Sequence, residues 1–107
     1  MALDILVNDL HDDIEKSISL YLDEYDKIME CIENTNDFKL IRSALSDYYG
    51  EHEIYIDDLE DLYKETLKLK EEFGSSHLNE VVRFIDDFLG IIGYAVKFRR
   101  TIKFIGD

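Results

Sequence analysis

Residues 77–104 read HLNEVVRFIDDFLGIIGYAVKFRRTIKF, which is the most apolar stretch of the chain. Apolar side chains recur there at three- and four-residue spacing: Leu78, Val81, Val82, Ile85, Phe88, Leu89, Ile91, Ile92, Ala95, Val96 and Ile102. That spacing is typical of an α-helix, and the apolar surface is wider than a single stripe. We therefore predict a helix over about residues 77–104 that is central in the fold or covered by a partner.

A second helical pattern opens the chain. Its apolar positions also step by three or four residues: Val7, Leu10, Ile14, Ile18, Tyr21, Tyr25, Ile28 and Ile32. The positions between them are rich in aspartate and glutamate, so the pattern predicts an amphipathic helix with an acidic outer face. We expect it over about residues 3–33, ended by the polar run at residues 34–37.

The stretch from residue 37 to residue 73 allows two interpretations. Ile41, Leu45 and Tyr48 precede Gly50, and the stripe continues roughly in phase at Leu59 and Leu62. One long helix with an interior glycine costs about 1 kcal/mol relative to alanine. Alternatively, Gly50 ends one helix and another begins just after it. The shared phase favours one kinked helix, which Gly74 then ends.

These three patterns predict an all-α fold, an antiparallel bundle of long helices at about residues 3–33, 37–73 and 77–104. Four helices result if the second breaks near Gly50. The chain has 107 residues, which suits one helical-bundle domain over residues 1–107. It contains no proline, which agrees with a largely helical chain because proline is costly inside helices.

Charge and composition restrict the partners. The net charge is −13, and residues 1–87 hold 24 acidic and 8 basic residues, a net −16. The electric field of this negative charge repels nucleic acid and anionic lipid and attracts basic surfaces. We expect no direct nucleic-acid binding, and no membrane binding because no apolar run approaches the roughly 20 residues of a membrane span. Cys31 is the single cysteine, which favours a reducing cytoplasm.

Residues 48–61, YYGEHEIYIDDLED, combine tyrosines with dense carboxylates. Tyrosine supplies rigid contact area, and carboxylates bind lysine and arginine. We predict that this segment binds a basic protein through Tyr48, Tyr49, Glu51, Glu53, Tyr55, Asp57, Asp58, Glu60 and Asp61. The expected function is an immunity protein, antitoxin or phage-type inhibitor that masks a basic partner such as a toxin or nuclease. The simpler alternative is an exposed helix face with core tyrosines.

No motif indicates an enzyme or a cofactor. The three histidines form neither Glu-x-x-His nor His-Glu-x-x-His, and one cysteine excludes finger-type zinc sites. The glycines form no phosphate-binding loop, although Gly90 and Gly93 have the spacing that lets helices approach closely. We therefore expect no catalytic residues, no metal and no cofactor.

Two further functions remain as alternatives. Glu30-x-x-Glu33 and Asp58-x-x-Asp61 place carboxylate pairs on helix faces, as magnesium binding requires. The pairs resemble those of the all-α nucleotide pyrophosphatases related to MazG, although that family's second pair is usually Glu-x-x-Asp. The resemblance implies magnesium-dependent nucleotide hydrolysis. The other alternative is a helical adaptor or secretion-associated partner that assembles, or forms a homodimer, through the helix at residues 77–104.

Overall fold

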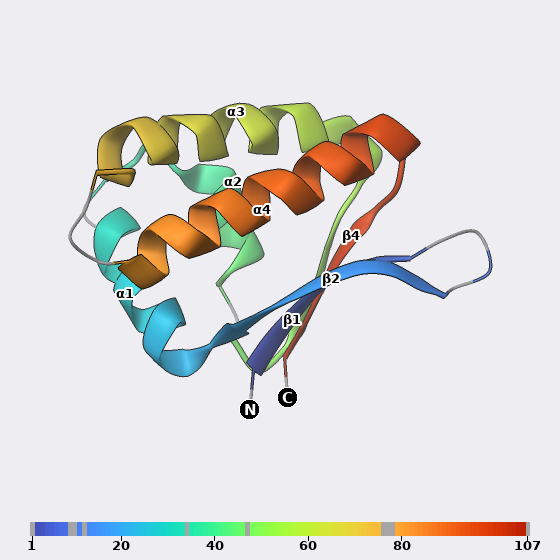
Figure 1. Cartoon of the computed structure of the whole chain (residues 1–107), viewed down its shortest axis with the longest axis horizontal. Coiled ribbons are helices and arrows are strands. Elements are labelled where there is room, and N and C mark those ends of the chain that lie inside the picture. Colours follow the sequence, from blue (N-terminus) through green and yellow to red (C-terminus); the bar gives the residue numbers. More distant parts are fainter. Residues whose placement is uncertain are drawn as a thin grey trace.

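The computed structural model describes residues 2–8, 11, 13–33, 35–46, 48–75 and 79–106. Its elements in chain order are β1 (Ala2–Asn8), β2 (Ile14–Tyr21), α1 (Leu22–Ile32), α2 (Lys39–Ala44), β3 (Glu51–Ile54), α3 (Ile56–Phe73), α4 (Asn79–Phe98) and β4 (Ile102–Gly106). The strands form one antiparallel sheet in the order β2-β1-β4-β3. The helices cover one face of this sheet (Figure 1). The all-α bundle is therefore wrong, because the fold is mixed α/β.

Alternation along the central strands explains the sheet. Leu3, Ile5 and Val7 of β1 are fully buried against the helices, whereas Asp4 and Leu6 face the other side and are only half-buried. On β4, Ile102 and Phe104 are buried in the same way. A period of two with one apolar face is what an antiparallel sheet covered on one side requires.

The longest helices supply most of the covering layer. α4 buries seven side chains: Val81, Phe84, Ile85, Phe88, Ile91, Ile92 and Ala95. Phe88 packs edge-on against Phe104 of β4, with 6.1 Å between ring centroids. α4 is thus central among the helices, as its composition suggested, but its apolar face is occupied within the chain. No helix in the described ranges is long and apolar enough to cross a membrane.

The predicted helix at residues 3–33 is wrong over most of its length. Residues 2–8 and 14–21 form the β1–β2 hairpin, and only Leu22–Ile32 is helical. In β1 the buried residues are two apart, and Ile5 of β1 pairs with Ile18 of β2. Short apolar runs fit periods of two and of three to four almost equally well, so the pattern alone misassigned them. Residues 1, 9, 10, 12, 34, 47, 76–78 and 107 lie outside the described part.

The two later helices also need correction. The predicted helix at residues 37–73 is interrupted well before Gly50, because α2 ends at Ala44 and the chain forms the short strand β3 before α3 begins. The predicted helix at residues 77–104 ends at Phe98, after which β4 starts at Ile102. Pairing with β1 and β3 places β4 inside the sheet, and this tertiary contact overrides local helical spacing. A four-helix bundle is therefore wrong as well.

Candidate protein-binding site

Strand β3 positions the first acidic residues of the predicted partner-binding segment. It is an edge strand, paired with β4 on one side only. Ile54 is buried and His52 lies 6.2 Å from the ring of Phe104, so these two residues face the helices. Glu51 and Glu53 alternate with them and are exposed. An exposed edge with charged side chains is available to a partner yet discourages edge-to-edge aggregation.

The first two turns of α3 carry the remaining acidic residues. Asp57 and Asp58 lie in the first turn, and Glu60 and Asp61 follow in the second. All four are exposed. Carboxylates in a first turn are stabilised by the helix dipole, which accounts for the first two. The dipole effect fades beyond that turn, so the helix itself gains little from the other two.

The tyrosines of the segment divide into two groups. Tyr48 is only 4% exposed, donates a hydrogen bond to the carbonyl of Leu20 at 3.2 Å and packs against the ring of Tyr25. It is a core residue, as the simpler alternative expected of these tyrosines. Tyr49 and Tyr55 are 58% and 61% exposed. We call the exposed set the acidic edge: Tyr49, Glu51, Glu53, Tyr55, Asp57, Asp58, Glu60 and Asp61.

Most carboxylates of the acidic edge form no ion pair with the residues that the structure describes. Glu53 lies 3.8 Å from Lys103, and its hydrogen bond and then its negative charge raise the pKa of Tyr55. The other five make no ion pair within the described part of the chain. The result is a surface segment with six exposed carboxylates, which attracts cations.

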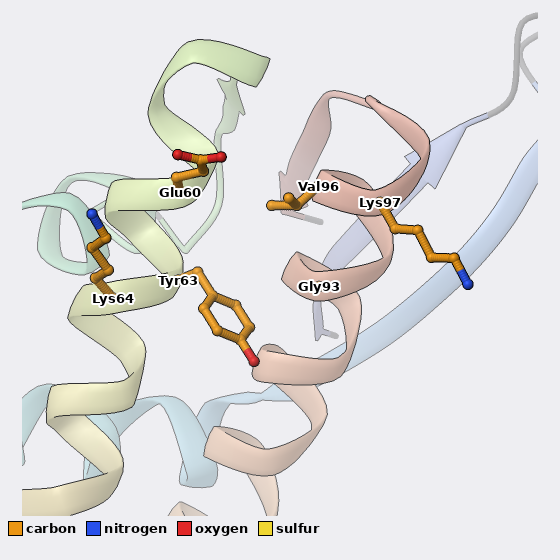
Figure 2. Close-up of a pocket in the computed structure, with 6 residues that line it drawn as sticks. All are labelled: Glu60, Tyr63, Lys64, Gly93, Val96 and Lys97. Carbon is orange, nitrogen blue, oxygen red and sulfur yellow. The ribbon is translucent and has the colours of Figure 1, made fainter.

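A groove between α3 and α4 begins beside the acidic edge. It consists of two adjoining hollows of about 270 Å³ and 290 Å³, and both are lined by Glu60 and Val96. Tyr63 points across the first hollow toward α4, and Val96 points toward α3, while Lys64 and Lys97 extend away (Figure 2). The second hollow is lined by Ile56, Asp57, Leu59 and Arg99 as well. We call these two hollows the α3–α4 groove.

Gly93 keeps the first hollow open. A Cβ atom added there would meet only the ring of Tyr63, at 3.7 Å, which is an ordinary van der Waals distance. Glycine within a helix costs about 1 kcal/mol relative to alanine. Neither close packing nor backbone conformation therefore requires glycine at this position, and its effect is to leave space between the two helices.

Arg99, which lines the second hollow, has an unusual conformation. Its φ of 57° is left-handed, and it follows the last residue of α4. The N–H of Arg100 donates to the carbonyl of Ala95, and the N–H of Arg99 donates to that of Val96. This is a Schellman ending, in which glycine is the preferred residue. This ending places a cationic residue beside Asp57 and Glu60, which line the same hollow.

The structure assembles no metal site from the residues it describes. α1 ends at the left of Figure 1, whereas α3 begins at the right, so the pair Glu30 and Glu33 lies far from the pair Asp58 and Asp61. No group of three or more histidine, cysteine, aspartate or glutamate side chains in the described ranges could hold an ion. Cys31 is half-buried, and burial followed by the charge of Glu30 raises its pKa, which disfavours the reactive thiolate.

Sequence reasoning found the acidic edge but not the groove beside it. The groove joins residues of α3 to residues of α4 some 30 positions later, which no local pattern indicates. Gly93 is a sequence signal for this region, but its spacing from Gly90 predicts a close contact between helices and not a hollow. No protein-family model matches the chain, and no curated protein or solved structure matches it significantly.

Proposed function

We propose that this protein binds and inhibits a basic macromolecular partner, such as a nuclease, in the manner of an immunity protein, antitoxin or phage-type inhibitor. One observation carries the proposal. Five exposed carboxylates that form no ion pair among the described residues adjoin the α3–α4 groove, and two of them, Asp57 and Glu60, line it. The proposed compartment is the cytoplasm.

The arrangement has the anatomy of a protein-binding surface. Binding energy usually concentrates in a few residues at a desolvated apolar centre, and a polar rim surrounds them. Here the groove offers the centre through Ile56, Tyr63 and Val96, and the acidic edge offers the rim. Tyr49 and Tyr55 add exposed aromatic area within the same segment of the chain.

Charge would act mainly on the rate of association. A cluster of like charges raises the rate at which an oppositely charged protein finds the surface, and salt weakens this effect. A partner rich in lysine and arginine would meet Glu51, Asp58 and Asp61 without first breaking an internal ion pair. Masking such a basic surface is enough to inhibit a nuclease, because the same cations contact the nucleic-acid backbone.

The test begins with partners captured by the full chain from cells that encode it. Each identified partner is purified and titrated against the chain at several salt concentrations. We expect a basic protein whose association slows steeply as salt rises, and whose activity falls on binding. The proposal fails if no basic partner is found or if binding is indifferent to salt.

A matched pair of variants separates the acidic edge from overall charge. Glu51→Lys with Asp58→Lys reverses two charges on the edge, whereas Glu71→Lys with Glu72→Lys makes the same net change at the exposed far end of α3. We expect the first pair to slow association at least tenfold more than the second. Equal effects would show that only the total charge matters, and the assignment to this edge would then be rejected.

A further inference from the structure

We infer that the free edge of β3 receives one extended segment of the partner, added as an antiparallel strand that carries lysine or arginine at two positions two residues apart. This inference rests on the proposed function and specifies the partner's binding segment. Two features of β3 carry it: the backbone groups that the strand turns away from the sheet, and the carboxylates that lie beside those groups.

Two residues of β3 turn their backbone polar groups away from the sheet. The N–H of Gly106 on β4 donates to the carbonyl of Gly50, just before β3, at 2.7 Å. In an antiparallel ladder, residues whose backbone groups point to the neighbouring strand alternate with residues whose groups point away. His52 therefore points to β4, whereas the N–H and C=O groups of Glu51 and Glu53 point to the free edge. None of these groups forms a hydrogen bond with another residue in the described part of the chain.

The free backbone groups require an extended occupant. Donors and acceptors on every second residue match the spacing of a strand, whereas a helix bonds its own backbone groups internally. The free ladder ends at Glu53, because the carbonyl of Tyr55 already accepts a hydrogen bond from the N–H of Asp58 at 3.0 Å. An added antiparallel strand can thus form about four hydrogen bonds, through one residue opposite Glu51 and one opposite Glu53.

The side chains beside these groups select a basic segment. Glu51 and Glu53 are exposed and alternate with the residues that face the helices. In an antiparallel pair, the side chains of opposite residues lie on the same face of the sheet, with Cα atoms about 5.5 Å apart when the pair is hydrogen-bonded. Two side chains of the added strand, two residues apart, would each lie across from one carboxylate. Lysine or arginine at both positions makes favourable cross-strand charge pairs, and an acidic residue would be repelled.

Strand β4 already shows this pairing on the other side of β3. Lys103 pairs directly with Glu53, and its ammonium group lies 3.8 Å from the carboxylate. Glu53 also forms a hydrogen bond with the side chain of Tyr55. The residue of β4 that pairs with Glu51 is Ile105, which offers no charge. The carboxylate of Glu51 therefore has the most to gain from a cation on an added strand.

The opposite edge of the sheet lacks these features. It is formed by β2, where the carboxylate of Glu15 accepts a hydrogen bond from Nε of Arg100 at 2.8 Å and another from the hydroxyl of Tyr94. The next residue, Lys16, adds a positive charge. A basic strand would thus meet a neutralised carboxylate and a repelling cation at β2, so we expect it at β3 alone.

The experiment uses two synthetic peptides of about twelve residues, which is longer than β3 and allows the register to adjust. One alternates lysine and threonine. The other has the same composition with lysines in adjacent pairs, so that no two lysines are two residues apart. Binding to the isotopically labelled chain is followed by the NMR signals of backbone amides. We expect the alternating peptide to shift Glu51 and Glu53, to leave Ser17 and Ser19 of β2 unchanged, and to bind about tenfold more tightly than the paired peptide.

Methyl groups on the peptide backbone separate hydrogen bonding from charge. Antiparallel pairing turns the N–H groups of the lysines that lie opposite Glu51 and Glu53 toward β3, and those of the threonines away from it. We expect N-methylation of the lysines to weaken the alternating peptide about tenfold or more. The same number of N-methyl groups on the threonines should change the affinity by no more than about twofold. Equal effects of the two methylated peptides would show that charge alone attracts the peptide, and the added strand would then be rejected.

A matched pair of variants tests the carboxylate. Glu51→Lys places a cation opposite the incoming lysine, whereas Glu71→Lys makes the same change in charge at an exposed position far along α3. We expect Glu51→Lys to weaken the alternating peptide about tenfold, and Glu71→Lys to weaken it by no more than about twofold. If Glu51→Lys fails to fold, the methylated peptides decide the question on the unmodified chain.

The outcomes separate this inference from the proposed function. The inference is overturned if the alternating peptide does not bind, if it shifts signals elsewhere, or if both spacings of lysine bind equally. It is also overturned if a basic partner binds the chain and Glu51→Lys lowers that affinity no more than Glu71→Lys, although the proposed function then stands. If the alternating peptide binds at β3 but no basic partner exists, the proposed function fails and the edge keeps its specificity for basic strands.

Discussion

The carboxylate of Glu65 on α3 caps the first turn of α2, where Oε1 accepts a hydrogen bond from the N–H of Ile41 at 2.9 Å. Its Oε2 accepts a second bond, from the N–H of Leu40 at 3.2 Å. The N-cap residue of α2, Phe38, provides no side-chain bond of its own. The first N–H groups of a helix have no partner within it, so a side chain from a neighbouring helix here replaces the local cap.

Replacing Glu65 should therefore destabilise the whole protein. We expect Glu65→Ala to lower the free energy of unfolding by about 1–2 kcal/mol, because two N–H groups in a half-buried position lose a charged acceptor. Glu65→Gln keeps one carbonyl oxygen and should lose about half as much. Urea unfolding followed by circular dichroism measures both. Equal losses for the two variants would contradict the capping role.

Gly106 allows two segments of backbone to approach closely. A Cβ atom there would lie 2.0 Å from the carbonyl oxygen of Tyr48, and the N–H of Gly106 donates to the carbonyl of Gly50 at 2.7 Å. Neither backbone atom can move without disturbing β4 or the turn before β3. We expect Gly106→Ala to lower the free energy of unfolding by about 1–3 kcal/mol, as overpacking does.

Gly90→Ala is the control for this prediction. Gly90 lies in α4 with open space around the added Cβ, so alanine should raise stability by up to about 1 kcal/mol. Thermal or urea unfolding of the two variants should thus give shifts of opposite sign. A stabilised Gly106→Ala variant would show that the close approach of β4 to residues 48–50 is not maintained in solution.

Local periodicity could predict helices but not their limits. α3 and α4 were both recognised from apolar residues three and four apart, and both are helical. The strands were missed because Val7, Ile14 and Ile18 fit a helical stripe as well as an alternating one. Pairing between β1 and β4 favours strand over helix for β1, and the paired residues are about a hundred positions apart. A single sequence carries no direct sign of such pairing.

The candidate site was predictable only where it is continuous in sequence. Glu51 to Asp61 attract notice through composition, and the structure places all their carboxylates at the surface. Tyr48 could not be separated from Tyr49 by composition, since its burial depends on contacts with Tyr25 and Leu20. The groove was invisible because its walls come from two helices that meet only after folding.

The ion pair between Lys27 and Glu80 predicts part of the response to acid. Their charged atoms are 3.1 Å apart. A hydrogen bond from its own backbone lowers the pKa of Glu80, and its bond to Lys27 lowers it further. A carboxyl whose pKa is lower in the folded state stabilises the fold above its unfolded pKa, which is about 4.3, and this contribution disappears as pH falls toward the folded value.

Glu80→Gln should consequently weaken the dependence of stability on acid. We expect the urea midpoint of the variant to fall less than that of the unmodified protein as pH is lowered from neutrality to below about 4. The difference should be small and should shrink with added salt, because the pair is only partly buried. Glu72→Gln, an exposed change without this pairing, is the comparison. Parallel pH profiles for all three proteins would contradict the prediction.

Arg99→Gly should stabilise the fold while altering the groove. Arg99 adopts a φ of 57° at the end of α4, and a residue with a side chain pays roughly 1 kcal/mol for that conformation relative to glycine. The variant should raise the free energy of unfolding by about that amount. The same substitution should also speed association with a basic partner, because it removes a cation that lies beside Asp57 and Glu60. A variant that is less stable than the parent would show that the guanidinium makes contacts that outweigh the backbone strain.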